Sequence, residues 1–145
     1  MGTEKAPNPA DVLLGHVTEA QLQAYVEQVA RLYGYLVMHQ RYSLKSESGF
    51  PDLVLVSAVR KRTLFVELKR EGKWPTVGRL VRTPAARWVT GQDEWLGDLL
   101  AAGNEVYLWW PSDRQDLVTV LDTGPVAGMP CVDRLPEYLA RREGA

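Results

Sequence analysis

Two carboxylates and one lysine stand in apolar, strand-like sequence, in the segments Gly49–Leu53 and Glu67–Lys69. The carboxylate of Asp52 directly precedes an apolar run, and Glu67 directly follows one. A charged side chain in such surroundings costs free energy if it is unpaired, so it rarely lacks a partner. The carboxylates suit a bound metal ion and the lysine suits a phosphate, so the pattern suggests chemistry on a phosphate group.

The two apolar runs, residues 52–56 and 63–69, are rich in β-branched and aromatic residues and flank a short polar connection. They therefore predict the two antiparallel strands of a hairpin. If the turn is centred directly after Val59, Asp52 lies opposite Glu67, with Cβ atoms roughly 5 Å apart. Both carboxylates can then reach one hard cation.

Alternation along the second strand places Phe65, Glu67 and Lys69 on one face of the sheet, with Glu67 and Lys69 roughly 7 Å apart. Pro51 is acceptable as the residue that opens a strand, because it needs no partner for a missing N–H. The competing interpretation is an ordinary solvated strand face with a cross-strand charge pair. Apolar residues on both faces of both strands favour a central hairpin instead.

The composition fits one compact domain: 145 residues, 46% of them hydrophobic. We expect a flexible lead-in over residues 1–15 and a single domain over 16–145.

The single Cys131 excludes an internal disulfide, and no Cys/His spacing is typical of structural zinc. No apolar run reaches ~18 residues and the N-terminus lacks the apolar core of a signal peptide, so we expect a cytoplasmic protein without a membrane span.

The net charge of −1 gives no general signature of nucleic-acid binding. Residues 60–87, however, hold nine basic and two acidic residues, a local charge of +7. Such a segment could present a basic face to a phosphate backbone, or could be a solvated loop.

The first predicted element is a helix that starts with the capping-box pattern Thr18-Glu-Ala-Gln21 and ends at Gly34. Glu19 and Gln23 lie four residues apart on it and could face a neighbouring site. The alternative for Glu19 is simple electrostatic stabilisation of the helix N-terminus, and spacing alone favours that alternative.

A strand over Tyr35–His39 leads into a polar loop, residues 40–49, which delivers the chain to Asp52. The stretch 71–82 after Lys69 is interrupted by Gly and Pro and reads as a substrate-facing loop or flap.

A second helix begins at Thr83-Pro84 or at Thr90 and ends before Gly103. Strands over residues 105–110 and 117–121 and a terminal helix over 133–142 complete the chain. The order α-β-β-β-α-β-β predicts an α/β fold, with a mixed β-sheet flanked by helices and one parallel pair.

These motifs, in this order, resemble the PD-(D/E)xK nuclease superfamily, and within it the VRR-NUC group of small standalone, often phage-encoded, nucleases. The matching stretches cover roughly residues 18–121: Thr18-Glu19 with Gln23, Gly34-Tyr35, His39, Gly49–Leu53, Phe65–Lys69, Gln92 with Trp95-Leu96, Ala102-Gly103, Val106–Trp109 and Pro111–Asp113. The stretch between Lys69 and Gln92 departs from the group, since it is longer and more basic.

The resemblance implies a restriction-endonuclease-like PD-(D/E)xK core that binds Mg²⁺ or Mn²⁺. Asp52, Glu67 and the backbone carbonyl of Leu68 would hold the ion, with Glu19 as a further acidic residue beside it. Lys69 would orient the attacking water and steady the developing charge, and Gln92 would sit at the edge of the site.

The activity implied is a metal-dependent endonuclease acting on branched DNA, such as a Holliday junction or a flap, in DNA repair or recombination, by a homodimer. The alternative is a catalytically silent nuclease-fold module that only binds DNA. DNA contacts are expected from the following residues, of which Trp74 would stack on bases: Arg41, Lys45, Arg70, Lys73, Trp74, Arg79 and Arg82.

Overall fold

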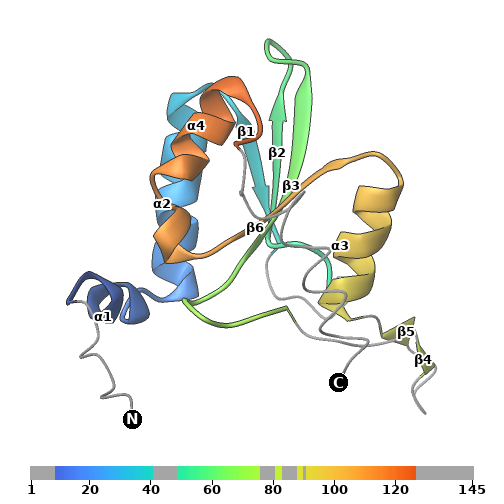
Figure 1. Ribbon diagram of the computed structural model, residues 1–145. Coiled ribbons are helices and arrows are strands. Elements are labelled where there is room, and N and C mark those ends of the chain that lie inside the picture. The colour runs from blue at the N-terminus through green and yellow to red at the C-terminus, as the bar shows by residue number, and fades with distance from the viewer. Residues whose placement is uncertain (1–8, 41–48, 76–80, 83–87, 90, 127–145) are drawn as a thin grey trace.

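The computed structural model describes residues 9–40, 49–75, 81–82, 88–89 and 91–126 (Figure 1). A four-stranded sheet with the order β1-β2-β3-β6 forms its centre. The strands are β1 (Leu36–His39), β2 (Leu53–Ser57), β3 (Arg62–Leu68) and β6 (Glu105–Trp109). A separate two-stranded ribbon pairs β4 (Val81–Arg82) with β5 (Trp88–Val89).

The predicted hairpin and its register are confirmed. Strands β2 and β3 are antiparallel, with Leu53 opposite Val66 and Ser57 opposite Arg62. The same register, extended by one residue, sets Asp52 opposite Glu67. The strand residues that alternate toward the main core are fully buried, as expected for a hairpin in the middle of a sheet.

The mixed sheet is confirmed as well. Strand β6 pairs with β3 in parallel, and β1 pairs with β2 antiparallel. The crossover from β3 to β6 passes through α3 (Gln92–Ala101). Helices α2 (Glu19–Leu32) and α4 (Asp116–Thr123) lie beside each other on one side of the sheet, and α3 lies on the other (Figure 1). The chain is thus an α/β protein with helices on both faces of its sheet.

Helix α2 begins where the sequence predicts. Thr18 is the N-cap, its hydroxyl accepts a hydrogen bond from Gln21 N at 3.1 Å, and Gln21 Oε1 accepts one from Thr18 N at 3.0 Å. The helix ends before Gly34, whose φ of 85° lies in the left-handed region that favours glycine. This cap places Glu19 in the first turn of α2, at the end of the helix nearest α1 (Figure 1).

The predicted strand over residues 117–121 is wrong, because this segment forms helix α4. Leu117, Val120 and Leu121 are fully buried while Thr119 is exposed, which is the i, i+3, i+4 spacing of a helix face. The β-branched residues drew the strand interpretation, but burial of one helical face outweighs a local preference of under about 1 kcal/mol per residue.

The other boundaries differ in detail. A short helix, α1 (Pro9–Gly15), occupies part of the predicted lead-in. Helix α3 follows the later of the two predicted starts, with Gly91 as its N-cap. The predicted helix over 133–142 lies outside the described residues, as does Cys131. None of the described helices is long and apolar enough to cross a membrane.

A cluster of polar residues joins the C-terminal end of α4 to the sheet. The Arg62 guanidinium pairs with Glu105, donates to Tyr35 Oη at 3.0 Å and donates to the Val120 carbonyl at 2.7 Å. The Tyr35 hydroxyl in turn donates to the Leu121 carbonyl at 2.7 Å. These bonds use carbonyls at the C-terminal end of α4, where a cation is favourable.

We expect Arg62→Met to lower the free energy of unfolding by about 2 kcal/mol, because it leaves Glu105 and the helix carbonyls without their charged donor. Urea unfolding followed by tryptophan fluorescence measures this change. Arg31→Met, at an exposed position of α2, should change it by less than about 0.5 kcal/mol. Equal losses in the two variants would contradict the role given to the cluster.

Candidate active site

The strand ends at Asp52 and Glu67 bring the two predicted carboxylates together. Asp52 Oδ2 accepts a hydrogen bond from the backbone N–H of Leu68 at 2.8 Å, which fixes the Asp52 side chain toward β3. The backbone of Asp52 is held by Gln40 N, which donates to its carbonyl at 2.7 Å. On the other side of β3, Lys69 N donates to the Trp109 carbonyl at 3.0 Å, so the residues that follow Glu67 are anchored to β6.

Glu67 is the most unusual residue of this group, because its charged side chain is only 1% exposed. Its Oε1 accepts a hydrogen bond from Gln92 Nε2 at 3.0 Å and lies 3.9 Å from Lys69 Nζ. Its Oε2 is buried and accepts no hydrogen bond from any residue in the described ranges. A buried carboxylate oxygen without a donor costs free energy in the folded state unless something satisfies it.

The surroundings of Glu67 disfavour its charged form. Burial raises the pKa of Glu67 well above its ordinary value of 4.5, and the negative charge of Asp52 and a hydrogen bond with Asp52 raise it further. Lys69 lowers this pKa, and the charge of Glu19 adds to the rise. A hydrogen bond between two carboxyl groups requires a proton on one of them, so with both groups ionised Glu67 Oε2 has no donor. A proton or a cation between the two carboxylates relieves this repulsion.

The two carboxylates fit a hard divalent cation, which prefers oxygen ligands and completes its shell with water. Within the described ranges, however, no group of three or more His, Cys, Asp or Glu side chains lies close enough to hold a metal ion. Glu19 is therefore not gathered with Asp52 and Glu67 into a three-carboxylate site, although its charge acts on Glu67. Metal contacts from Glu19 and from the Leu68 carbonyl stay predictions.

Helix α3 contributes to the site from the opposite face of the sheet to α2. Gln92, the first residue of α3, donates a hydrogen bond to Glu67 and therefore lies beside the carboxylates. One turn later, the Trp95 ring packs edge-to-face on Phe50, with centroids 5.0 Å apart, and Phe50 also meets Phe65 at 6.2 Å.

This aromatic cluster is a feature that the sequence interpretation missed. Phe65 shares a strand face with Glu67, and Trp95 lies three residues after Gln92 on the same helix. These two spacings are the sequence features that could have placed both rings beside the site.

The structure describes only some of the residues that were predicted to contact DNA. Arg70 and Lys73 are exposed, and Arg70 donates to the Gly15 carbonyl at 3.2 Å. Trp74 is partly buried, packs edge-to-face on Trp110 at 5.0 Å and so contributes to the core margin. Three of the predicted contacts lie outside the described residues: Arg41, Lys45 and Arg79. For a fourth, Arg82 in β4, only the backbone is described.

Comparison with known proteins does not add a family to this picture. The chain has no significant match to a family model, to a curated protein or to a solved structure. What can be inferred about its function therefore depends on the site itself.

Proposed function

We propose that the chain is a metal-dependent nuclease with a PD-(D/E)xK core of the VRR-NUC type. One observation carries the proposal: the buried Glu67 carboxylate lies beside a second carboxylate and 3.9 Å from a lysine amine, and one of its oxygens has no donor among the residues that the structure describes. A purely structural role does not account for this arrangement, because two neighbouring carboxylates destabilise each other.

Asp52 and Glu67 would hold the cation, Mg²⁺ or Mn²⁺. When bound, it activates a water molecule and offsets the charge of the scissile phosphate. The Leu68 N–H orients the Asp52 carboxylate, and the Gln92 amide orients Glu67. Such second contacts hold metal-binding carboxylates in the conformation that binding requires.

Lys69 supplies the positive charge on the substrate side of the site. It follows Glu67 by two residues on the same strand face, and its side chain is mostly buried beside that carboxylate. In this position its ammonium donates to the attacking water or to a phosphate oxygen and stabilises the charge that develops there. A lysine has no metal affinity at neutral pH, so it complements the carboxylates rather than competing with them.

DNA is the proposed substrate, in a branched form such as a four-way junction or a flap, and a homodimer would present two sites to two strands. The support is the excess of basic residues over 60–87, which includes Arg70 and Lys73, both exposed and close to Lys69 in the sequence. Phosphate contacts of this kind give affinity that falls steeply with salt.

The direct test incubates the protein with labelled four-way junction, flap, splayed-arm and linear DNA of shared sequence, each with Mg²⁺ or with EDTA. We expect cutting of a branched form in Mg²⁺ and none in EDTA. Gel shifts in EDTA measure binding on the same substrates. Salt-sensitive binding without cutting under any metal condition would replace the nuclease by the non-catalytic DNA-binding module.

A further inference from the structure

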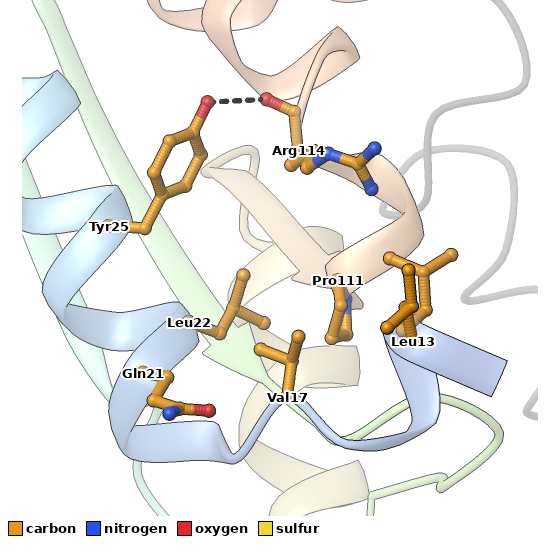
Figure 2. Close-up of a pocket in the computed structure, with 8 residues that line it drawn as sticks. Leu13, Val17, Gln21, Leu22, Tyr25, Pro111 and Arg114 are labelled. Carbon is orange, nitrogen blue, oxygen red and sulfur yellow. Dashed lines mark hydrogen bonds between the residues drawn. The ribbon is translucent and has the colours of Figure 1, made fainter. Parts of the chain in front are cut away.

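A cavity of about 380 Å³ lies between α1, the first turns of α2 and the turn that follows β6 (Figure 2). Its volume is within the range of small-molecule binding sites. The wall is largely apolar, with two polar side chains, Gln21 and Arg114, beside the following residues: Leu13, Leu14, Val17, Leu22, Tyr25 and Pro111.

The polar atoms of this wall are mostly in use. Gln21 Oε1 accepts the capping hydrogen bond from Thr18 N. The Tyr25 hydroxyl donates to the backbone carbonyl of Arg114 at 3.0 Å, the dashed line in Figure 2. The Arg114 guanidinium, in contrast, has no ion pair and no hydrogen bond to any residue that the structure describes. In Figure 2 it extends above Pro111 and Leu13.

The cavity therefore offers an apolar wall and a guanidinium that no residue within the described part of the chain pairs with. Arg114 is exposed and its guanidinium can bind a carboxylate through two parallel hydrogen bonds. Leu22 belongs to the hydrophobic core and Val17 packs against it, so both would shield the apolar groups of a ligand from water. A neutral apolar molecule would leave the guanidinium unpaired, and a cation would be repelled by it.

We propose that this pocket binds a small anionic amphiphile, with a compact aliphatic or aromatic body inside the cavity and a carboxylate on Arg114. The pocket differs from the candidate active site in its chemistry, since it pairs apolar walls with a cation instead of two carboxylates. It is independent of the proposed nuclease activity, and its test needs no DNA. A bound ligand that contacts Leu13 of α1 and Leu22 of α2 would also hold the two helices together.

Isothermal titration calorimetry with hexanoate, octanoate and decanoate, each below its micelle concentration, tests the proposal. We expect one site per chain and an affinity that rises about three- to fourfold per added methylene group, as burial of the chain requires. Decanoate should bind more tightly than decanol, and decyltrimethylammonium should bind least. Decanoate should also raise the thermal midpoint of unfolding, because it binds the folded state.

Two variants separate the charge from the cavity. Arg114→Gln should weaken decanoate binding on the order of fivefold and leave decanol binding unchanged. Leu13→Trp, at a position 69% exposed on the pocket rim, should fill the cavity and weaken both ligands without disturbing the core. Arg31→Gln, at the other end of α2, is the matched control and should bind decanoate as the parent protein does. Circular dichroism checks that each variant is folded.

Three results would overturn the proposal. The first is no saturable decanoate binding by the parent protein up to millimolar concentration. The second is binding that Arg114→Gln and Leu13→Trp leave unchanged, which would place the ligand elsewhere. The third is a parent protein that is oligomeric by sedimentation and becomes monomeric in Leu13→Trp, which would assign the pocket to a second copy of the chain.

Discussion

Replacing Lys69 with alanine should reduce the rate of Mg²⁺-dependent DNA cleavage by about 10²- to 10³-fold, the usual cost of removing one group that stabilises developing charge. Glu67→Gln should reduce it at least as much, because the amide keeps the shape of the side chain but loses the charge that would hold the cation. The measurement is single-turnover cleavage of the preferred DNA, with enzyme in excess so that binding does not limit the rate.

The two variants should differ in metal dependence. Raising the Mn²⁺ concentration should partly restore Glu67→Gln, whose defect is in ion binding, and should not restore Lys69→Ala. Arg31→Ala and Asp98→Asn remove one exposed charge of each sign from α2 and α3 and serve as controls that should cut normally. Wild-type rates in Glu67→Gln with Mg²⁺ would exclude the proposed mechanism.

The second large effect concerns stability without metal. Because burial and Asp52 raise the pKa of Glu67 in the folded protein, the folded state holds a proton that the unfolded state releases above its ordinary pKa of 4.5. Unfolding therefore releases a proton between this value and the raised one, and the free energy of unfolding falls as the pH increases through that window. For one proton the slope is at most about 1.4 kcal/mol per pH unit.

Glu67→Gln should remove this slope and should make the metal-free protein more stable than the parent at pH 7.5. Mn²⁺ should reverse the order: at 100 times its Kd for the parent it stabilises the parent by about 2.7 kcal/mol, and it stabilises the more weakly binding variant by much less. Urea unfolding from pH 5 to pH 8, in EDTA and in Mn²⁺, gives both quantities. The difference between parent and variant isolates Glu67 from the other titrating groups, and parallel pH curves for the two proteins would contradict the assigned burial effect.

The sequence carried enough information for the part of the fold that is locally encoded. A capping box and a helical stripe defined α2, and a short connection between two β-rich runs defined the hairpin with its register. That register alone set Asp52 opposite Glu67. The parallel pairing of β3 with β6 also followed, because a strand, a helix and a strand connect in few ways.

The parts that local pattern could not give depend on tertiary contacts. Residues 117–121 have strand-like composition, and only burial against the sheet makes them a helix. The bond from Gln92 to Glu67 joins residues 25 positions apart, and the pairing of Phe50 with Trp95 spans a longer separation. The pocket beside Arg114 combines α1, α2 and the turn after β6, and no single stretch of sequence describes it.

The parallel pairing of β3 with β6 has a consequence for the order in which the protein folds. Asp52 and Glu67 belong to one hairpin, so they meet by closing a short loop, which costs little chain entropy. Gln92 reaches Glu67 after a longer excursion of the chain, and Trp109 accepts its bond from Lys69 only when β6 docks. Non-local contacts of this kind are slow to form. The mutually repelling carboxylates therefore come together before Gln92 and β6 are in place, and a divalent cation present during folding would stabilise the hairpin at the stage when it has least support.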